Sequence, residues 1–205
     1  VFSPIDVEET VYLREEKITI TRFQNHYEVF DYETFTTYIF DGYNGYDKYR
    51  LTKIVDKAGF TTKLHVSGDR LLMIEDSAGR KIKAYANDKG KVLKLSLLRE
   101  NGEDILVSYG YDEDGNMTRI TDALEKSTKI QYKNHLMVEK TDRNGQTFYW
   151  EYDGEKTGSR CIHTWGDDGW QEGWIEYFPE KGYNLVTDAN GAVTTYYYEP
   201  SQLIT

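Results

Sequence analysis

The stretch YGYDEDGNMTRITD, residues 109–122, contains the pattern that decides the fold of this chain. Within it, Asp112-Glu-Asp-Gly115 is typical of a tight turn, because Asp bonds to the backbone ahead of it and Gly adopts a positive φ at little steric cost. The residues after this turn form a short strand-like run that ends in a second aspartate, Asp122. Two such runs joined by a tight turn predict an antiparallel β-hairpin.

The same turn signal recurs along the chain at regular intervals. The Asp-x-x-Gly tetrapeptides are Asp56–Gly59, Asp76–Gly79, Asp112–Gly115, Asp142–Gly145 and Asp188–Gly191. The interval from Asp56 to Asp122 is 66 residues, and so is the interval from Asp122 to Asp188. An interval of this length holds three units of about 22 residues. The spacing predicts further turns near residues 99 and 165, where the sequence reads ENG (100–102) and GDDG (166–169).

Runs of five to eight residues with alternating apolar and polar side chains lie between the turns, as in Phe60–Val66 and Thr147–Tyr152. Such runs predict strands, and consecutive strands are expected to pair as antiparallel hairpins. The expected fold is therefore all-β, built from hairpins of about 22 residues. At Asp122 the tetrapeptide ends in Glu125 instead of Gly, which predicts a turn of different shape there.

Residues 1–49 alternate like strands but lack the Asp-x-x-Gly signal, whereas residues 50–205 contain it in about seven units. A Gly/Tyr/Asn loop, residues 41–47, separates the two sections. The sequence thus predicts an irregular β segment, 1–49, followed by a repeat segment, 50–205, in one continuous sheet. The chain starts at Val1 and stops in mid-pattern, which predicts a fragment of a longer protein.

Composition narrows the classes of partner. The 205 residues suffice for a buried core, and 15% of them are aromatic. The formal net charge is −10, which argues against nucleic acid, because phosphate binding needs an excess of cations. The charge is uneven: −6 over residues 1–49, +7 over 50–99 and −11 over 100–205. Because the chain lacks an apolar run near 18 residues, no membrane span is expected.

The repeated pattern resembles the tyrosine-aspartate (YD, or Rhs) repeat, in which Tyr-Asp, two variable residues and Gly precede an apolar strand that ends in Asp. The stretches that carry the resemblance are residues 109–122, 141–153, 160–167 and 185–198. It covers about residues 50–205, and several in-phase copies make it specific.

The resemblance implies a fold and a role. In Rhs-type toxins of bacteria, such repeats coil as one extended, curved sheet into a hollow shell that encloses a C-terminal toxin or effector domain. The implied partners are further repeats of the same chain, the enclosed toxin and secretion machinery, and the implied location is outside the cell that delivers it. A fragment of such a sheet has open strand edges through which it is expected to self-associate.

Catalytic, cofactor and metal sites are not expected. In the family, self-cleaving carboxylates lie near an Asp-Pro motif. None of the three prolines of this chain follows an aspartate, so no catalytic residue is carried over. The four histidines lack zinc-site spacing. Asp112-Glu-Asp114 faintly resembles a calcium loop, but Ala123 occupies the position of its bidentate glutamate.

One aromatic cluster supports an alternative function. Trp165, Trp170 and Trp174 lie within ten residues, among glycines and acidic residues, and could offer stacking faces to a sugar. The alternative is thus a carbohydrate-binding or adhesion module with a cell-surface glycan as partner. The interpretation that we favour is structural: the three rings fill or line the wall of the sheet.

Overall fold

The computed structural model of the chain describes residues 5–41, 49–68 and 70–198. It divides into two compact units, Val1–Leu106 and Val107–Thr205. The described residues form eighteen β-strands and two three-residue 3-10 helices, and they contain no α-helix. The expected all-β fold is confirmed. Residues 42–48, most of the loop expected between an irregular and a repeat section, lie outside the described residues, so that division stays a prediction.

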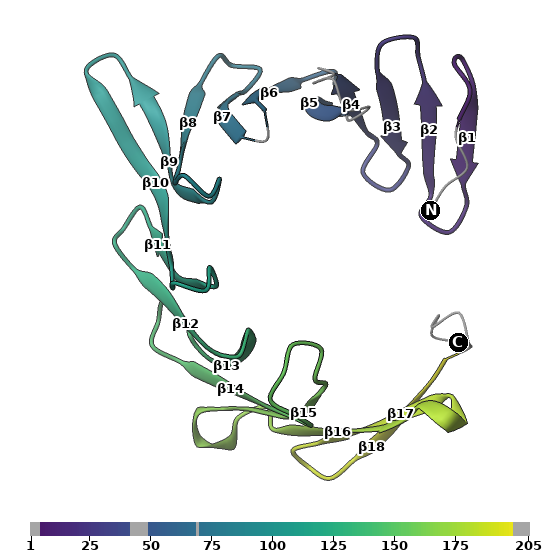
Figure 1. Cartoon of the computed structure of the whole chain (residues 1–205), viewed down its shortest axis with the longest axis vertical. Helices are drawn as coiled ribbons and strands as arrows, with labels where there is room; N and C mark the ends of the chain where they lie inside the picture. Colours follow the sequence, from purple (N-terminus) through teal and green to yellow (C-terminus); the bar gives the residue numbers. More distant parts are fainter. Residues whose placement is uncertain (1–4, 42–48, 69, 199–205) are drawn as a thin grey trace. The chain divides into compact units, whose positions relative to one another are not determined.

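In the first unit, each strand pairs antiparallel with the next strand along the chain, which confirms the predicted hairpins (Figure 1). Strand β10 contains residues of both units and also pairs with β9. The strands are β1 (Thr10–Leu13), β2 (Ile18–Arg22), β3 (Tyr27–Asp31), β4 (Thr36–Asp41), β5 (Arg50–Val55), β6 (Thr61–Ser67), β7 (Arg70–Glu75), β8 (Lys81–Ala86), β9 (Val92–Arg99) and β10 (Gly102–Tyr111).

The second unit continues the same sequential pairing from β10 to β18. The 3-10 helices η1 (Asp167–Gly169) and η2 (Pro179–Lys181) lie in the connections before and after β16. The strands are β11 (Met117–Asp122), β12 (Ser127–Lys133), β13 (Leu136–Thr141), β14 (Thr147–Tyr152), β15 (Cys161–Gly166), β16 (Gly173–Phe178), β17 (Tyr183–Asp188) and β18 (Val193–Tyr197).

The aspartate side chain closes the repeat turn. Between β13 and β14, Asp142 Oδ1 accepts hydrogen bonds from the N–H of Asn144 at 2.7 Å and of Gln146 at 3.0 Å. The N–H of Gly145, which has φ +94°, donates to the Asp142 carbonyl at 3.1 Å. The Gln146 N–H, followed by that of Asn144, lowers the pKa of the Asp142 carboxyl below its ordinary value. Equivalent bonds are made at Asp56, Asp76 and Asp188, with Gly59, Gly79 and Gly191 in the glycine position.

The turns alternate between the two edges of the sheet that are formed by the ends of the strands, because each strand runs opposite to the one before. The predicted members near residues 99 and 165 are present: they connect β9 to β10 and β15 to β16. Asp112 and Gly115 lie at the other edge, between β10 and β11. Two further residues on that edge, Asn87 and Asp153, accept the same closing N–H bond, from Lys91 at 3.0 Å and from Arg160 at 2.8 Å.

The turn at Asp122 was predicted to have a different shape, and that prediction is wrong. Asp122 Oδ1 accepts the N–H of Leu124 at 2.9 Å and of Lys126 at 3.0 Å, and Glu125 N–H donates to the Asp122 carbonyl at 3.0 Å. Glu125 occupies the glycine position with φ +60°. The carboxylate bonds thus hold a residue with a Cβ in a backbone region that it normally avoids.

β-Bulges recur at one place in the repeat. A register shift occurs in the pairing of β4 with β5, β6 with β7, β8 with β9, β10 with β11, β12 with β13 and β14 with β15. In the last three, the shift falls beside Tyr111, Tyr132 and Tyr152. In the first three, the equivalent position holds Phe40, Val66 and Ala86. A bulge bends its strand and redirects side chains, so the bend recurs both with and without a tyrosine.

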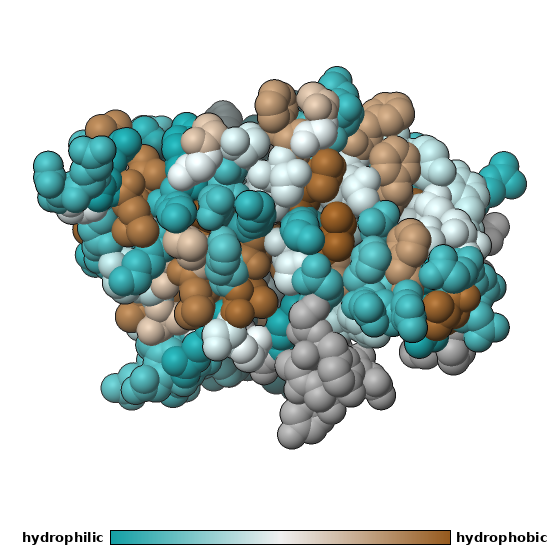
Figure 2. Space-filling model, turned by 90° about the horizontal axis from the view of Figure 1, so that it is seen from above, coloured by the Kyte–Doolittle hydropathy of each residue, from teal (hydrophilic) through white to brown (hydrophobic). Residues whose placement is uncertain are grey.

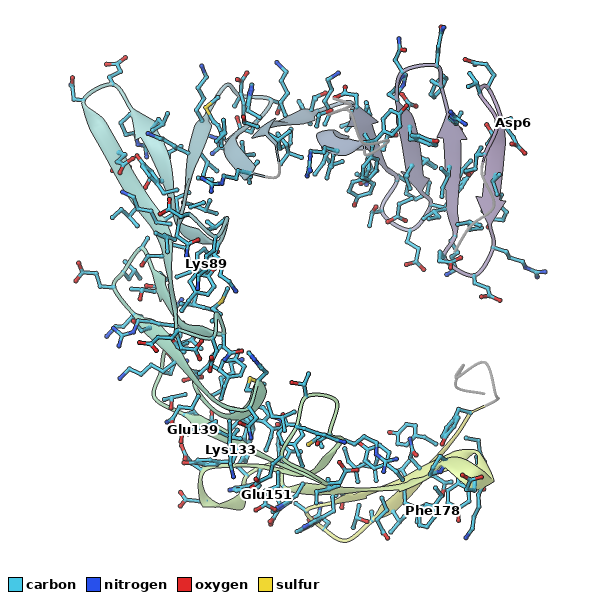
Figure 3. All side chains as sticks on the ribbon, viewed as in Figure 1. Asp6, Lys89, Lys133, Glu139, Glu151 and Phe178 are labelled. Atoms are coloured by element: carbon cyan, nitrogen blue, oxygen red, sulfur yellow. The ribbon has the colours of Figure 1, made fainter. Side chains whose placement is uncertain are left out.

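The sheet is a single layer with almost no enclosed core. Among the described residues only Ala84, Ser96 and Gly166 are buried. Side chains extend from both faces of the strands (Figure 3), and apolar residues appear on the molecular surface among hydrophilic ones (Figure 2). The length of the chain allows a buried core, but a single layer encloses none, because a second layer is needed to cover an apolar face.

Candidate functional site

Apolar side chains form a row across one face of each unit. Residues directly opposite each other in paired strands share a face, and the register therefore defines the row. In the first unit, it contains Val11, Ile20, Val29, Tyr38 and Ile54, on β1 to β5. In the second unit, it contains Tyr109, Ile120, Ile130, Phe148, Ile175 and Val186. It is interrupted by Thr128 opposite Ile120, by Lys140 opposite Ile130 and Phe148, and by Gly166 opposite Phe148. In each unit, we call the side of the sheet that carries the row the apolar face and the opposite side the polar face.

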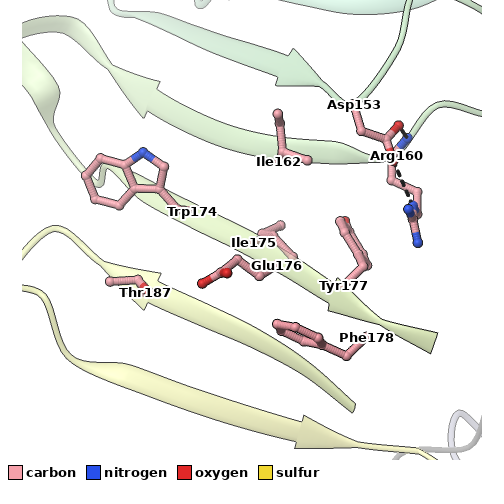
Figure 4. Close-up of a pocket in the computed structure, with 9 residues that line it drawn as sticks. All are labelled: Asp153, Arg160, Ile162, Trp174, Ile175, Glu176, Tyr177, Phe178 and Thr187. Carbon is pink, nitrogen blue, oxygen red and sulfur yellow. Dashed lines mark hydrogen bonds and ion pairs between the residues drawn. The ribbon is translucent and has the colours of Figure 1, made fainter. Parts of the chain in front are cut away.

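A cavity of about 660 Å³ lies at the β15–β16 hairpin (Figure 4). The two strands share only two register pairs, His163 with Trp174 and Thr164 with Gly173. Residues of both strands, of the preceding turn and of β17 line the cavity: Asp153, Arg160, Ile162, Trp174, Ile175, Glu176, Tyr177, Phe178 and Thr187. A second cavity, of about 360 Å³, is lined by Val138, Trp150 and Ile162 among others.

Tyrosine hydroxyl groups connect neighbouring hairpins. Tyr152 on β14 donates to the carbonyl of Met137 on β13, and Tyr177 on β16 donates to the carbonyl of Cys161 on β15, both at 2.7 Å. Met137 and Cys161 are the bulge partners of Tyr132 and Tyr152. Each hydroxyl therefore satisfies a carbonyl at the place where a bulge disrupts the ladder of backbone bonds.

The environment of these tyrosines favours the neutral phenol. Burial raises the pKa of Tyr152 and of Tyr177 above the ordinary value, and the nearby Cys161 thiol adds to both shifts. The Arg160 guanidinium lies over the Tyr177 ring at 4.6 Å and pairs with Asp153 at 2.9 Å. These contacts hold the two tyrosines in place, so that their hydroxyl groups connect strands of neighbouring repeats.

The structure separates the three tryptophans that sequence analysis grouped as a ligand site. Trp165 and Trp174 lie on the polar face, where His163 stacks against both, with ring centroids at 4.3 and 5.1 Å. Trp170 lies over Gly166 and contacts Phe148 on the apolar face, with centroids 5.6 Å apart. The three rings therefore do not form one platform, and sugar binding by them stays a prediction.

Four rings form a continuous stack on the polar face, which we call the aromatic ladder: Tyr149, Trp165, His163 and Trp174. Tyr149 stacks on Trp165 across the β14–β15 pairing, with centroids 5.4 Å apart and planes 21° apart. The planes of His163 and Trp174 are 6° apart. Tyr149 and His163 were not predicted from the sequence as neighbours of the tryptophans, because only the register shows which residues of adjacent strands meet.

Carboxylates surround the ladder. His163 Nδ1 lies 3.1 Å from Glu151 Oε2, and Nε2 lies 2.9 Å from Glu172 Oε1. Asp167 Oδ2 accepts the Thr147 N–H at 2.7 Å, and its Oδ1 accepts the Tyr149 hydroxyl at 3.4 Å. The ring nitrogens of His163 are thus occupied by protein carboxylates, which orient the imidazole between the two indoles.

The turn aspartates and glycines identified in the sequence have structural contacts. Their carboxylates accept backbone N–H groups within their own turns, at opposite edges of the sheet, and are not gathered into one site. Within residues 5–41, 49–68 and 70–198, no group of three His, Cys, Asp or Glu side chains is arranged to hold a metal ion. The helices of that part of the chain are too short to cross a membrane.

Two solved structures illustrate the likeness of fold. The first is a chain in the crystal structure of TcdB2-TccC3-Cdc42, which the present chain matches with a TM-score of 0.54 and 11% sequence identity. The match covers 97% of the present chain and 12% of the TcdB2-TccC3-Cdc42 chain. The second is a chain in a mutant Tc holotoxin pore of Photorhabdus luminescens, with a TM-score of 0.45 and 12% sequence identity. This match covers 97% of the present chain and 13% of the holotoxin chain. At these identities the likeness concerns the fold alone. No curated protein sequence matches the chain.

The sequence itself matches a family of repeat proteins. The Teneurin YD-shell family aligns with residues 24–166, which is more than half of the 205 residues. That range contains the turns at Asp56, Asp76, Asp112, Asp122 and Asp142 and the bulge tyrosines Tyr111, Tyr132 and Tyr152. Aspartates close the turns of the repeat, tyrosines lie beside three of its bulges, and the chain belongs to the Teneurin YD-shell family.

Proposed function

We propose that this chain forms part of the wall of a YD shell that encloses a polypeptide cargo. The observation that carries the proposal is the uncovered apolar face of a single-layer sheet. Every residue of the two rows, from Val11 to Ile54 and from Tyr109 to Val186, is partly exposed, and none of them is buried. Such a surface is unfavourable in water, so a second polypeptide surface is needed to cover it.

The family and the fold support this role. The chain spans 12% of the length of the TcdB2-TccC3-Cdc42 chain that it matches, so the remainder of a shell comes from further repeats. In this proposal the irregular segment, residues 1–49, precedes a repeat segment, 50–205, in one curved sheet. The wall itself is structural and not catalytic, and its cargo is a toxin or effector domain that is delivered outside a bacterial cell.

Photo-crosslinking tests which face meets the cargo. A photo-crosslinking amino acid is placed at position 130 or at position 131 of a polypeptide that carries this segment with its complete shell. Ile130 lies on the apolar face of β12, and the adjacent Gln131 points to the opposite side. We expect cross-links to the enclosed domain from position 130 and not from 131.

The two positions make the result decisive. Cross-linking from position 131 alone would show that the polar face is the lining. Absence of cargo cross-links at both positions, together with digestion of the cargo by protease as fast as the isolated domain, would overturn the proposal of enclosure.

A further inference from the structure

The aromatic ladder has two ends, Tyr149 and Trp174, and the outer ring face of Trp174 is not covered by another ring of the described residues. Trp165 is inside the stack, between Tyr149 and His163. Trp174 is at one end: one side stacks on His163, and in the described residues no other ring contacts it. Its cross-strand neighbour on β17 is the smaller Thr187, and Trp174 is 39% exposed. An accessible indole face at the end of a fixed stack is a surface on which a ligand can bind.

The cavity at the β15–β16 hairpin brings a carboxylate to this indole. Trp174, Glu176 and Thr187 all line it (Figure 4). Trp174 and Glu176 are two residues apart on β16, so their side chains leave the strand on the same face. Neither a hydrogen bond nor an ion pair engages the Glu176 carboxylate within the described residues. The ring and the acceptor are therefore both available to one incoming group.

Negative charge predominates around the ladder: Arg160 lines the same cavity as Glu176, but its guanidinium pairs with Asp153. Five carboxylates lie on or beside it: Glu139, Glu151, Asp167, Glu172 and Glu176. No lysine or arginine in the described part of the chain is within ion-pair distance of any of them. Five carboxylates around a single imidazole give the group a net negative charge, which favours a cation at the open end.

We propose that the open face of Trp174, together with Glu176, binds a lysine or arginine side chain of a basic polypeptide segment. An ammonium or guanidinium group is attracted to the face of an indole, and a carboxylate beside the ring adds a charge-assisted hydrogen bond. A neutral sugar also stacks on an indole but gains nothing from the net negative charge. Trp174 and Glu176 leave β16 on the polar face, whereas the cargo is proposed to meet the apolar face.

Titration of the 205-residue chain with a hexa-arginine peptide tests the proposal, with tryptophan fluorescence and calorimetry as measurements. The neutral control peptide contains citrulline, which has nearly the shape of arginine without its charge. We expect the arginine peptide to bind at least tenfold more tightly than the citrulline peptide. Trp174→Ala and Glu176→Gln are each expected to weaken its binding by about fivefold to tenfold, which is in the range of a partly desolvated cation–π contact.

Matched variants distinguish the site from general attraction to an acidic protein. Phe60→Ala removes an exposed aromatic ring from the first unit, and Glu113→Gln removes a carboxylate from a distant turn. Both are expected to bind the arginine peptide as the parent does. Circular dichroism confirms that each variant keeps its strands.

Three results would overturn the proposal. The first is equal weakening by Glu113→Gln and Glu176→Gln, which would indicate only long-range attraction. The second is Trp174-dependent binding of a neutral oligosaccharide in the absence of peptide binding, which would identify a sugar site. The third is no binding of the arginine peptide at low salt by a folded chain.

Discussion

Two hairpins of the second unit turn at the same edge of the sheet but are held in different ways. Between β13 and β14, the Asp142 carboxylate closes its own turn through the N–H groups of Asn144 and Gln146. Between β15 and β16, the carboxylate of Asp167 bonds instead to Thr147 and Tyr149 of β14. Both hairpins also have a backbone bond between residues i and i+4: Asp142 N–H donates to the Gln146 carbonyl at 2.8 Å, and Gly166 N–H donates to the Trp170 carbonyl at 2.6 Å.

The difference shows that the turns of this sheet are stabilised in two ways, by hydrogen bonds between residues close in sequence and by side-chain packing. The β13–β14 turn depends on neighbours in sequence, so the same four residues form it wherever they occur. The β15–β16 turn depends on packing, because Trp170 needs the absence of a side chain at Gly166 and the ring of Phe148. Its departure from the repeat also places Trp170 and Trp174 on opposite faces. Four variants test this comparison.

The largest effect is expected from Gly166→Val. A Cβ at this position would lie 3.0 Å from the Trp170 carbonyl oxygen and 3.3 Å from its ring, contacts too close for ordinary packing. Overpacking of this kind costs about 2–3 kcal/mol of unfolding free energy. Chemical denaturation measures it, with Thr164→Val as a control on the same strand. An unchanged midpoint would show that Trp170 does not pack over Gly166.

Tyr152→Phe is expected to cost about 1 kcal/mol, because it leaves the Met137 carbonyl without its hydroxyl partner. Tyr196→Phe, at a residue that is 42% exposed, is the control and should change stability much less. Since burial raises the pKa of Tyr152 in the folded state, its contribution is complete below about pH 10 and is lost as the pH rises through the raised value. The stabilities of the parent and of Tyr152→Phe should therefore converge at alkaline pH. A loss of unfolding free energy in Tyr152→Phe that increases with pH would contradict a stabilising bond between the Tyr152 hydroxyl and the Met137 carbonyl.

Glu125→Gly is expected to stabilise the chain by about 0.5–1 kcal/mol. Glu125 has φ +60°, and glycine adopts that conformation without the steric penalty of a Cβ. The reverse control is Gly145→Ala, which introduces a Cβ at φ +94° and should destabilise. Thermal denaturation gives both values, and a loss of stability in Glu125→Gly would refute backbone strain at this turn.

The smallest effect at neutral pH is expected from Asp142→Asn. Asn87 already accepts the same closing bond in the β8–β9 turn, so an amide oxygen can replace the carboxylate. The pKa of Asp142 is lowered in the folded state, so the contribution of its ionised form is present above the ordinary pKa and is lost as the pH falls through the lowered value. The Asn variant should therefore lose less stability than the parent between pH 5 and pH 2. Asp142→Ala, which has no acceptor, should be less stable throughout.

Much of the fold was predictable because it rests on local chemistry. The Asp-x-x-Gly turns, the strands between them and the missing members near residues 99 and 165 all follow from spacing. The shape of the turn at Glu125 was not predicted, because the bonds of the Asp122 carboxylate outweigh the preference of Glu for negative φ. The aromatic ladder was not predictable either, since its rings come from three strands.

By itself, the sequence determined the strands, the turns and the phase of the repeat, because residues within four positions of each other make the bonds that define them. Only the tertiary structure decided which side chains share a face. A bulge or an irregular turn adds a residue to one strand and changes the face to which the next side chains point. For this reason Trp165 and Trp174 meet across His163, whereas Trp170, between them in the sequence, lies on the other side of the sheet.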